Sequence, residues 1–157
     1  MTILLVLAGV WLFAFLVFCL ALCKAASQSV PGLRHSHPTI LVIDDDTSVL
    51  NIIRMGLEHE GYNVHTASNP KEGIRLFQKI SRNVSLVLLD FNMPEMTGDR
   101  VFEALRKIDP QVPVLLVTAF IDDLKVTQLR NSVRGYLLKP FPLGELIGKV
   151  RELVSFS

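Results

Sequence analysis

TILVIDDD, residues 39–46, is the stretch that decides the fold. Five apolar or β-branched residues run without interruption and end abruptly in three aspartates. Such a run is typical of a parallel β-strand that is buried on both faces, because a strand with one wet face would alternate apolar and polar residues. The pattern therefore predicts a sheet that is covered by helices on both sides.

The same pattern recurs along the chain, with an amphipathic stretch after each apolar run. We expect strands at residues 39–43, 62–67, 84–89, 114–117 and 134–138. The first helix is expected to begin at Asp46 or Thr47 and to stop at Gly61, with an apolar face made of Val49, Leu50, Ile52, Ile53 and Leu57. The alternation predicts an α/β fold: a doubly wound, five-stranded parallel sheet in the flavodoxin-like order 2-1-3-4-5.

The N-terminal part of the chain differs from the rest in composition. No charged residue occurs from Ile3 to Cys23, and a helix of that length spans roughly 30 Å, the thickness of a bilayer core. We interpret residues 1–24 as a hydrophobic segment and transmembrane helix, residues 25–37 as a flexible linker and residues 38–157 as a folded domain.

The charges beside this segment give an expected location. Lys24 and Arg34 follow the apolar run, which favours a single-pass protein of the inner (cytoplasmic) membrane, attached through residues 3–23, with the folded domain in the cytoplasm. Two alternatives stay open. The segment can be a cleaved secretory signal, or it can follow from a misassigned translation start, in which case the protein is cytoplasmic.

Charge and cysteine content exclude some classes of function. All fifteen acidic residues and fourteen of the sixteen basic residues lie at or after Asp44. That balance leaves no net positive charge for binding nucleic acid. Both cysteines, Cys19 and Cys23, lie within the apolar run, so the folded domain has neither a disulfide framework nor a cysteine metal site.

Chemically active side chains follow the ends of several predicted strands. The first strand ends in Asp44 and Asp45, the third in Asp90, the fourth in Thr118 and the fifth in Lys139. Because the carboxyl ends of parallel strands meet at one edge of the sheet, we expect these groups to gather there. Clustered carboxylates repel one another, and Mg²⁺, which prefers oxygen ligands, removes that repulsion. The sequence therefore predicts a magnesium site beside a nucleophilic carboxylate.

Four segments carry a resemblance to a known family. They are ILVIDDD (40–46), LVLLDFNMPEMTG (86–98), VLLVTAF (114–120) and GYLLKPF (135–141). In content, order and spacing they resemble the receiver domain of two-component response regulators, of the single-domain chemotaxis type, behind an N-terminal hydrophobic segment. The resemblance covers roughly Pro38 to the end of the chain.

The resemblance implies a role for each site residue. Asp90 resembles the phosphoacceptor, with Thr118 and Lys139 as its catalytic partners. Mg²⁺ would be bound by Asp44, Asp45, Asp90 and the backbone carbonyl of Asn92. Thr118 and Tyr136 resemble the switch pair, and Pro140 would follow a cis peptide bond. The third acid, Asp46, departs from many members of the family, and we interpret it as a helix cap rather than a ligand.

These roles imply a signalling domain, not an enzyme that turns over an external substrate. It would accept a phosphoryl group on Asp90 from a histidine kinase or a histidine phosphotransfer protein. We expect no output domain after Val154, so the domain would then signal to an unknown downstream protein. Two alternatives stay open: an interaction module that works without phosphorylation, and a Mg²⁺-dependent hydrolase.

Overall fold

The computed structural model describes residues 37–119, 124–129 and 131–155 of the chain. Strands and helices alternate through these ranges, as the apolar pattern predicts. The elements, in chain order, are β1 (Thr39–Ile43), α2 (Thr47–His59), β2 (Asn63–Ala67), α3 (Pro70–Ile80), the short 3-10 helix η1 (Ser81–Asn83), β3 (Val84–Asp90), α4 (Gly98–Ile108), β4 (Val114–Thr118), α5 (Leu124–Leu129), β5 (Gly135–Leu138) and α6 (Leu143–Ser155).

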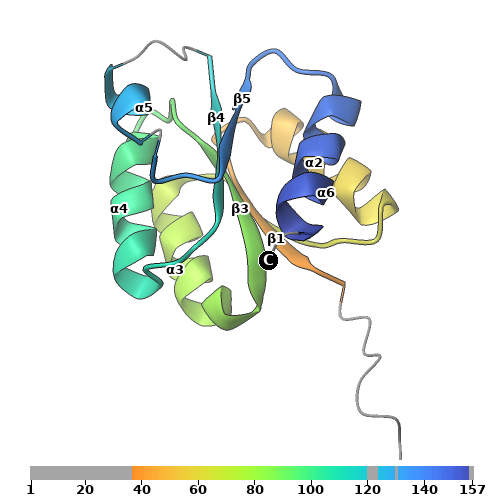
Figure 1. Ribbon diagram of the computed structural model, residues 1–157, viewed down its shortest axis with the longest axis horizontal. Coiled ribbons are helices and arrows are strands. Elements are labelled where there is room, and N and C mark those ends of the chain that lie inside the picture. The colour runs from red at the N-terminus through yellow and green to blue at the C-terminus, as the bar shows by residue number, and fades with distance from the viewer. Residues whose placement is uncertain (1–36, 120–123, 130, 156–157) are drawn as a thin grey trace, which may run out of the picture. The chain divides into compact units, whose positions relative to one another are not determined.

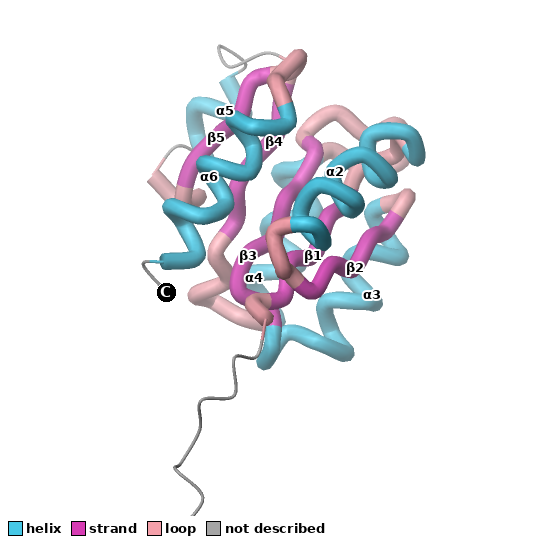
Figure 2. The backbone as a smooth tube through the Cα atoms, turned by 90° about the vertical axis from the view of Figure 1, so that its right-hand side faces the viewer, coloured by secondary structure: helices cyan, strands magenta, loops and turns pink. Residues whose placement is uncertain are grey.

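The strands form one parallel sheet in the order β2-β1-β3-β4-β5, which confirms the predicted topology. Helices α3, α4 and α5 cover one face, and α2 and α6 cover the other (Figure 1). Figure 2 views the second side and shows α2 and α6 lying over the strands. This arrangement leaves the carboxyl ends of the strands open at one edge of the sheet.

Each face of the sheet has its own hydrophobic core. In β1, Leu41 and Ile43 enter the core under α3 and α4, whereas Ile40 and Val42 enter the core under α2 and α6. All four side chains are at most 1% exposed. Successive side chains of a strand point to opposite faces, so a strand between two helical layers must be apolar at every position.

Capping residues fix the ends of the helices that flank the site. The Asp46 carboxylate accepts hydrogen bonds from the backbone N–H groups of Ser48 and Val49 at the start of α2, so the predicted cap is confirmed. Gly61, at φ 87°, turns the chain after α2 into β2, in the left-handed region that favours glycine. Pro70 is the first residue of α3, a position that suits proline because the first N–H groups of a helix have no partner within it.

One residue of the predicted apolar face of α2 lies elsewhere. Leu50, Ile53 and Leu57 are buried, but Ile52 is 58% exposed. Ile52 is one position away from the stripe that points at the sheet, and a helix turns by about 100° per residue. Its inclusion in the core-facing stripe was wrong, and its side chain forms part of an exposed apolar surface instead.

The predicted membrane location needs correction. No helix within the described ranges is both long enough and apolar enough to cross a membrane. Residues 3–23, on which the prediction of a transmembrane helix rested, lie outside the described residues, as does the linker up to residue 36. The interpretation of the protein as a single-pass protein of the inner membrane is therefore withdrawn.

Candidate functional site

Hydrogen bonds beyond the strand ends hold the candidate residues in place. The backbone N–H of Asp44 donates to the carbonyl of Ala67 at 3.2 Å, and the N–H of Lys139 donates to the carbonyl of Thr118 at 2.8 Å. These bonds extend the β1–β2 and β4–β5 pairings past their last paired residues. The backbone that carries the site is therefore as firmly anchored as the sheet itself.

Three charged side chains meet at this edge. The Nζ atom of Lys139 is 2.7 Å from Oδ2 of Asp44 and 3.2 Å from Oδ1 of Asp90. Both carboxylate side chains are 4% exposed, and the lysine side chain is 26% exposed. The Lys139 ammonium, just after β5, thus joins the carboxylates that follow β1 and end β3, as their positions at the strand ends predict.

The carboxylates also form a potential cation site. Asp44, Asp45 and Asp90 each offer an oxygen atom, and these atoms lie within 4.8 Å of one another. The buried Oδ1 of Asp90 accepts no hydrogen bond from the described residues, although it is close to the Lys139 ammonium. Asp45 is exposed and so leaves the cluster open to solvent. Carboxylate oxygens from three residues that lie this close together, one side of them open to solvent, fit a divalent cation such as Mg²⁺.

The electrostatic environment changes two pKa values. Burial raises the pKa of Asp90 above its ordinary value of 3.8; the Lys139 charge opposes this effect and the Asp44 charge adds to it. For Lys139, burial is the largest single influence and lowers the pKa. The hydrogen bond to Asp44 and the charges of Asp90 and Asp44 together outweigh burial, so the pKa of Lys139 rises above 10.5. Lys139 is therefore a permanent cation at neutral pH.

Thr118 and Asn92 complete the surroundings of Asp90. Thr118, at the end of β4, is fully buried, and its hydroxyl lies 3.5 Å from Oδ1 of Asn92. The backbone N–H of Asn92 hydrogen-bonds to the Asp90 carboxylate and lowers its pKa. The exposed side chain of Asn92 thus links the loop after β3 to the end of β4.

Tyr136 lies farther from the charged cluster than the other predicted residues. It is paired with Leu116 in the sheet register, whereas Thr118 is paired with Leu138. Its half-buried ring packs against the core under α3 and α4. Because residues two apart on a strand share a face, Thr118 and Leu116 point to the same side of the sheet as Tyr136.

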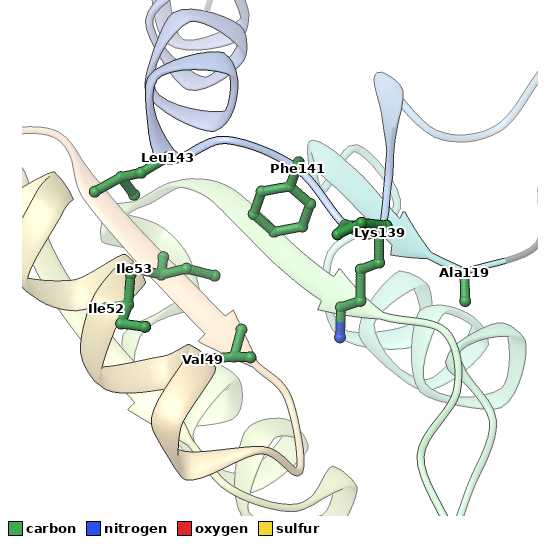
Figure 3. Close-up of a pocket in the computed structure, with 8 residues that line it drawn as sticks. Val49, Ile52, Ile53, Ala119, Lys139, Phe141 and Leu143 are labelled. Carbon is green, nitrogen blue, oxygen red and sulfur yellow. The ribbon is translucent and has the colours of Figure 1, made fainter.

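An apolar cavity beside the charged cluster was not predicted from the sequence. It has a volume of about 470 Å³, and Figure 3 shows Val49 and Ile53 of α2 facing Phe141 across it, while the ammonium of Lys139 points away toward the loop after β3. The Lys139–Pro140 peptide bond that borders it is cis, as predicted. The full lining is Val49, Ile52, Ile53, Ala119, Lys139, Pro140, Phe141 and Leu143.

The apolar residues of α2 that line this cavity were visible in the sequence, but they were predicted to belong to the hydrophobic core. Helix α2 carries more apolar residues than its buried stripe needs, and Ile52 and Met55 are 58% and 68% exposed. An exposed apolar surface of this kind, next to polar chemistry, is typical of an interaction site.

Comparison with curated proteins identifies close relatives. The chain is 38% identical over 121 residues to the transcriptional regulatory protein PrrA of Mycobacterium leprae, a match that covers 76% of this chain and 51% of that protein. It is 40% identical over 114 residues to the uncharacterized transcriptional regulatory protein YkoG of Bacillus subtilis, covering 71% of this chain and 49% of that protein. The chain thus matches about half the length of these relatives.

Solved structures share the fold and the extent of the domain. A CheY-like response regulator receiver domain protein from Methanospirillum hungatei matches with a TM-score of 0.69 and 30% identity, over 76% of this chain and 95% of that one. The response regulator TrrA of Thermotoga maritima, solved in complex with Mg²⁺ and BeF, matches with a TM-score of 0.61 and 33% identity, over 73% and 97% of the two chains.

A family model agrees with both comparisons and with the geometry of the site. The model that matches is that of the response regulator receiver domain, and the match covers residues 40–151, from β1 to within α6. It includes all five strands of the sheet except Thr39, the first residue of β1, and all the acidic residues of the candidate site. The chain therefore belongs to the response regulator receiver domain family of two-component signalling, whose members are signalling domains rather than classical enzymes.

Proposed function

We propose that this receiver domain is a phosphorylation switch in which Asp90 is the phosphoacceptor. The phosphodonor is a phosphohistidine on a histidine kinase or a histidine phosphotransfer protein. One observation carries the proposal: a buried carboxylate lies 3.2 Å from a permanent ammonium and shares a cation site with two more carboxylates. An aspartate with only a structural role would be expected at an exposed position, because burying a carboxylate costs free energy even when other charges surround it.

The transfer step balances as a displacement at phosphorus. An oxygen of the ionised Asp90 carboxylate forms a bond to phosphorus while the bond from phosphorus to the histidine nitrogen breaks. The electron pair of that bond returns to the imidazole, which takes up a proton from solvent when a neutral ring is restored. The product is an aspartyl phosphate, which water later hydrolyses to release inorganic phosphate.

The residues around Asp90 support this step electrostatically. Lys139 already lies between Asp44 and Asp90, so its ammonium is placed to pair with oxygens of the transferred group. The Thr118 hydroxyl is placed to donate to the same oxygens after it leaves Asn92. Mg²⁺, held by Asp44, Asp45, Asp90 and the Asn92 carbonyl, would neutralise the negative charge that accumulates there.

The pKa of Asp90 is raised, so a second cation beside it would favour the ionised carboxylate. A carboxylate attacks phosphorus only when it is ionised, and both burial and the Asp44 charge oppose ionisation. Lys139 offsets part of that effect. The effect of burial and of the Asp44 charge against ionisation of Asp90 is greatest before a second cation is bound, so we expect Mg²⁺ to promote phosphorylation.

The signal is read as a change on the β4–β5 side of the domain. Thr118 would follow the phosphoryl group, and Tyr136, which packs on the same side of the sheet, would move into the space beside it. Phosphorylation would thereby favour one of two packings of this surface, which a downstream protein recognises.

The apolar cavity would serve as the docking surface for the phosphodonor protein. Lys139 lines it and also contacts Asp90, so a partner that packs against Val49, Ile53 and Phe141 would be adjacent to the phosphoacceptor. An amphipathic helix that carries the phosphohistidine fits such a surface.

The test is a measurement of intact mass. The protein is incubated with acetyl phosphate and Mg²⁺, and the same incubation is made with chelator and with Asp90→Asn. We expect the mass of one phosphoryl group to be gained by the unaltered protein alone. Equal gain in Asp90→Asn would contradict the assignment, and no gain in any sample would favour an interaction module that works without phosphorylation. The exposed Ile52 and Met55 are the observation that favours this second candidate.

A further inference from the structure

Asp46, the third acid of the DDD sequence, makes two kinds of hydrogen bond. Its side-chain Oδ1 accepts from the backbone N–H of Ser48 at 2.8 Å and from that of Val49 at 3.3 Å. Its own backbone N–H donates to Oδ1 of Asp44 at 2.9 Å. The same residue therefore caps α2 and holds a carboxylate of the cation site.

The hydrogen bond from the Asp46 N–H determines the orientation of the Asp44 carboxylate. Asp44 is 3% exposed, and its two oxygens have different partners: Oδ1 accepts from the Asp46 N–H, and Oδ2 accepts from the Lys139 ammonium at 2.7 Å. The direction of the Asp46 N–H depends on the backbone of Asp46, which is extended at φ −84° and ψ 104°. Capping by the Asp46 side chain stabilises that conformation, because the two N–H groups that it binds belong to the first turn of the helix.

We propose that Asp46 is a positioning residue for the cation site. Its side chain fixes the peptide group whose N–H orients Asp44, so the start of α2 and the arrangement of the carboxylates are formed together. This inference rests on the proposed function, in which Asp44 binds Mg²⁺.

Two other roles for Asp46 fit the structure less well. As a direct ligand it is not part of the cluster: both of its capping bonds use Oδ1, and the carboxylate oxygens that gather within 4.8 Å of one another belong to Asp44, Asp45 and Asp90. As a source of attractive charge it would act through solvent, because the side chain is exposed, and Asp46→Asn, which removes the charge and keeps the cap, separates that role from positioning.

The test compares two variants of Asp46 in the full chain. Asp46→Asn removes the charge but keeps a side chain that caps equally well, whereas Asp46→Ala removes both. Mg²⁺ affinity is measured by titration calorimetry in about 0.15 M salt, so that long-range effects of surface charge are screened equally in all variants. We expect Mg²⁺ to bind about five- to tenfold more weakly to Asp46→Ala and within about twofold of the unaltered protein to Asp46→Asn.

A second capped helix provides a matched control. Asn69 caps α3 by accepting from the Glu72 N–H at 2.9 Å, and none of its hydrogen bonds involves the cation site. Asn69→Ala should therefore lose as much thermal stability as Asp46→Ala and keep its Mg²⁺ affinity. In NMR spectra of the unaltered protein, the Asp46 amide signal should shift on addition of Mg²⁺.

Each contrary result has a separate meaning. Unchanged Mg²⁺ affinity in Asp46→Ala would overturn the positioning role. Equal weakening in Asp46→Asn and Asp46→Ala would assign the effect to charge or direct binding, and equal weakening in Asn69→Ala would assign it to general loss of stability. Absence of Mg²⁺ binding in the unaltered protein would overturn the proposed function itself, and this inference with it.

Discussion

Gly98 offers a sharp test of how closely the site is packed, because its position admits no side chain. It begins α4, and its N–H donates to the carbonyl of Phe91 at 2.8 Å, which closes the loop after the phosphoacceptor strand. A β-carbon on Gly98 would lie 2.7 Å from the Cα of Phe91 and 2.9 Å from the carbonyl oxygen of Asp90. Both atoms belong to the backbone and cannot move aside by a change of rotamer.

The cost of Gly98→Ala follows from these distances. Carbon atoms in contact settle at about 3.5–4.0 Å, so the added methyl group would overlap the Phe91 backbone by about 1 Å. Overpacking of this kind costs about 1–3 kcal/mol of unfolding free energy. The matched control is Gly148→Ala in α6, where a β-carbon has nothing within 4 Å. That change should stabilise the protein by about 0.5–1 kcal/mol, because alanine favours a helix more than glycine does.

Urea unfolding followed by circular dichroism measures both changes. We expect the midpoint to fall for Gly98→Ala and to rise for Gly148→Ala, with the slope unchanged. Because the clash pushes on the backbone of Asp90 and Phe91, Gly98→Ala should also slow phosphorylation by acetyl phosphate. A Gly98→Ala protein at least as stable as the unaltered one would refute the close packing of α4 against the loop.

Three further predictions concern stability. The folded-state pKa of Asp90 is raised above 3.8, so the contribution of Asp90 to the unfolding free energy, measured without divalent cations as the difference from Asp90→Asn, should fall as pH rises from 3.8 through that raised value, by about 1.4 kcal/mol for each tenfold change in the acid constant. Asp90→Asn should lose this dependence, and parallel pH profiles from about pH 3 to 7 would contradict the pKa direction. Phe77→Ala, at a fully buried position, should cost about 3–5 kcal/mol in urea unfolding, whereas Ile52→Ala should stay within about 0.5 kcal/mol; similar losses would contradict their burial. Gly61→Ala should cost about 1–2 kcal/mol because of its positive φ, and an unchanged midpoint would contradict that conformation.

The fold could be predicted from the sequence because the apolar composition of the central strands by itself indicates that they are buried on both faces. β1, β3 and β4 are apolar at nearly every position, a pattern that only a sheet with two covered faces explains. The parallel order then brought the strand ends together, so Asp44, Asp90 and Lys139 could be placed at one edge before any distance was known.

What the sequence did not reveal depends on side-chain directions and on contacts between distant elements. The helical spacing of α2 included Ile52 in the core face, although it lies one position outside the buried stripe. The cavity lies between α2 and Phe141, which belongs to the segment after β5. Its size depends on the distance between these two elements, and no local sequence pattern encodes that distance. The double role of Asp46 likewise depends on a backbone N–H, which every residue type except proline carries.

The most direct test of the central claim is to locate the acyl phosphate among three neighbouring carboxylates. The protein is phosphorylated by acetyl phosphate with Mg²⁺, reduced with borohydride, which converts an aspartyl phosphate to homoserine, and sequenced by peptide mass spectrometry. We predict homoserine at position 90 alone, because Asp90 ends β3 beside the Thr118 end of β4, whereas both oxygens of Asp44 already accept hydrogen bonds, from the Asp46 N–H and from Lys139. Homoserine at position 44 or 45, with position 90 unmodified, would contradict it.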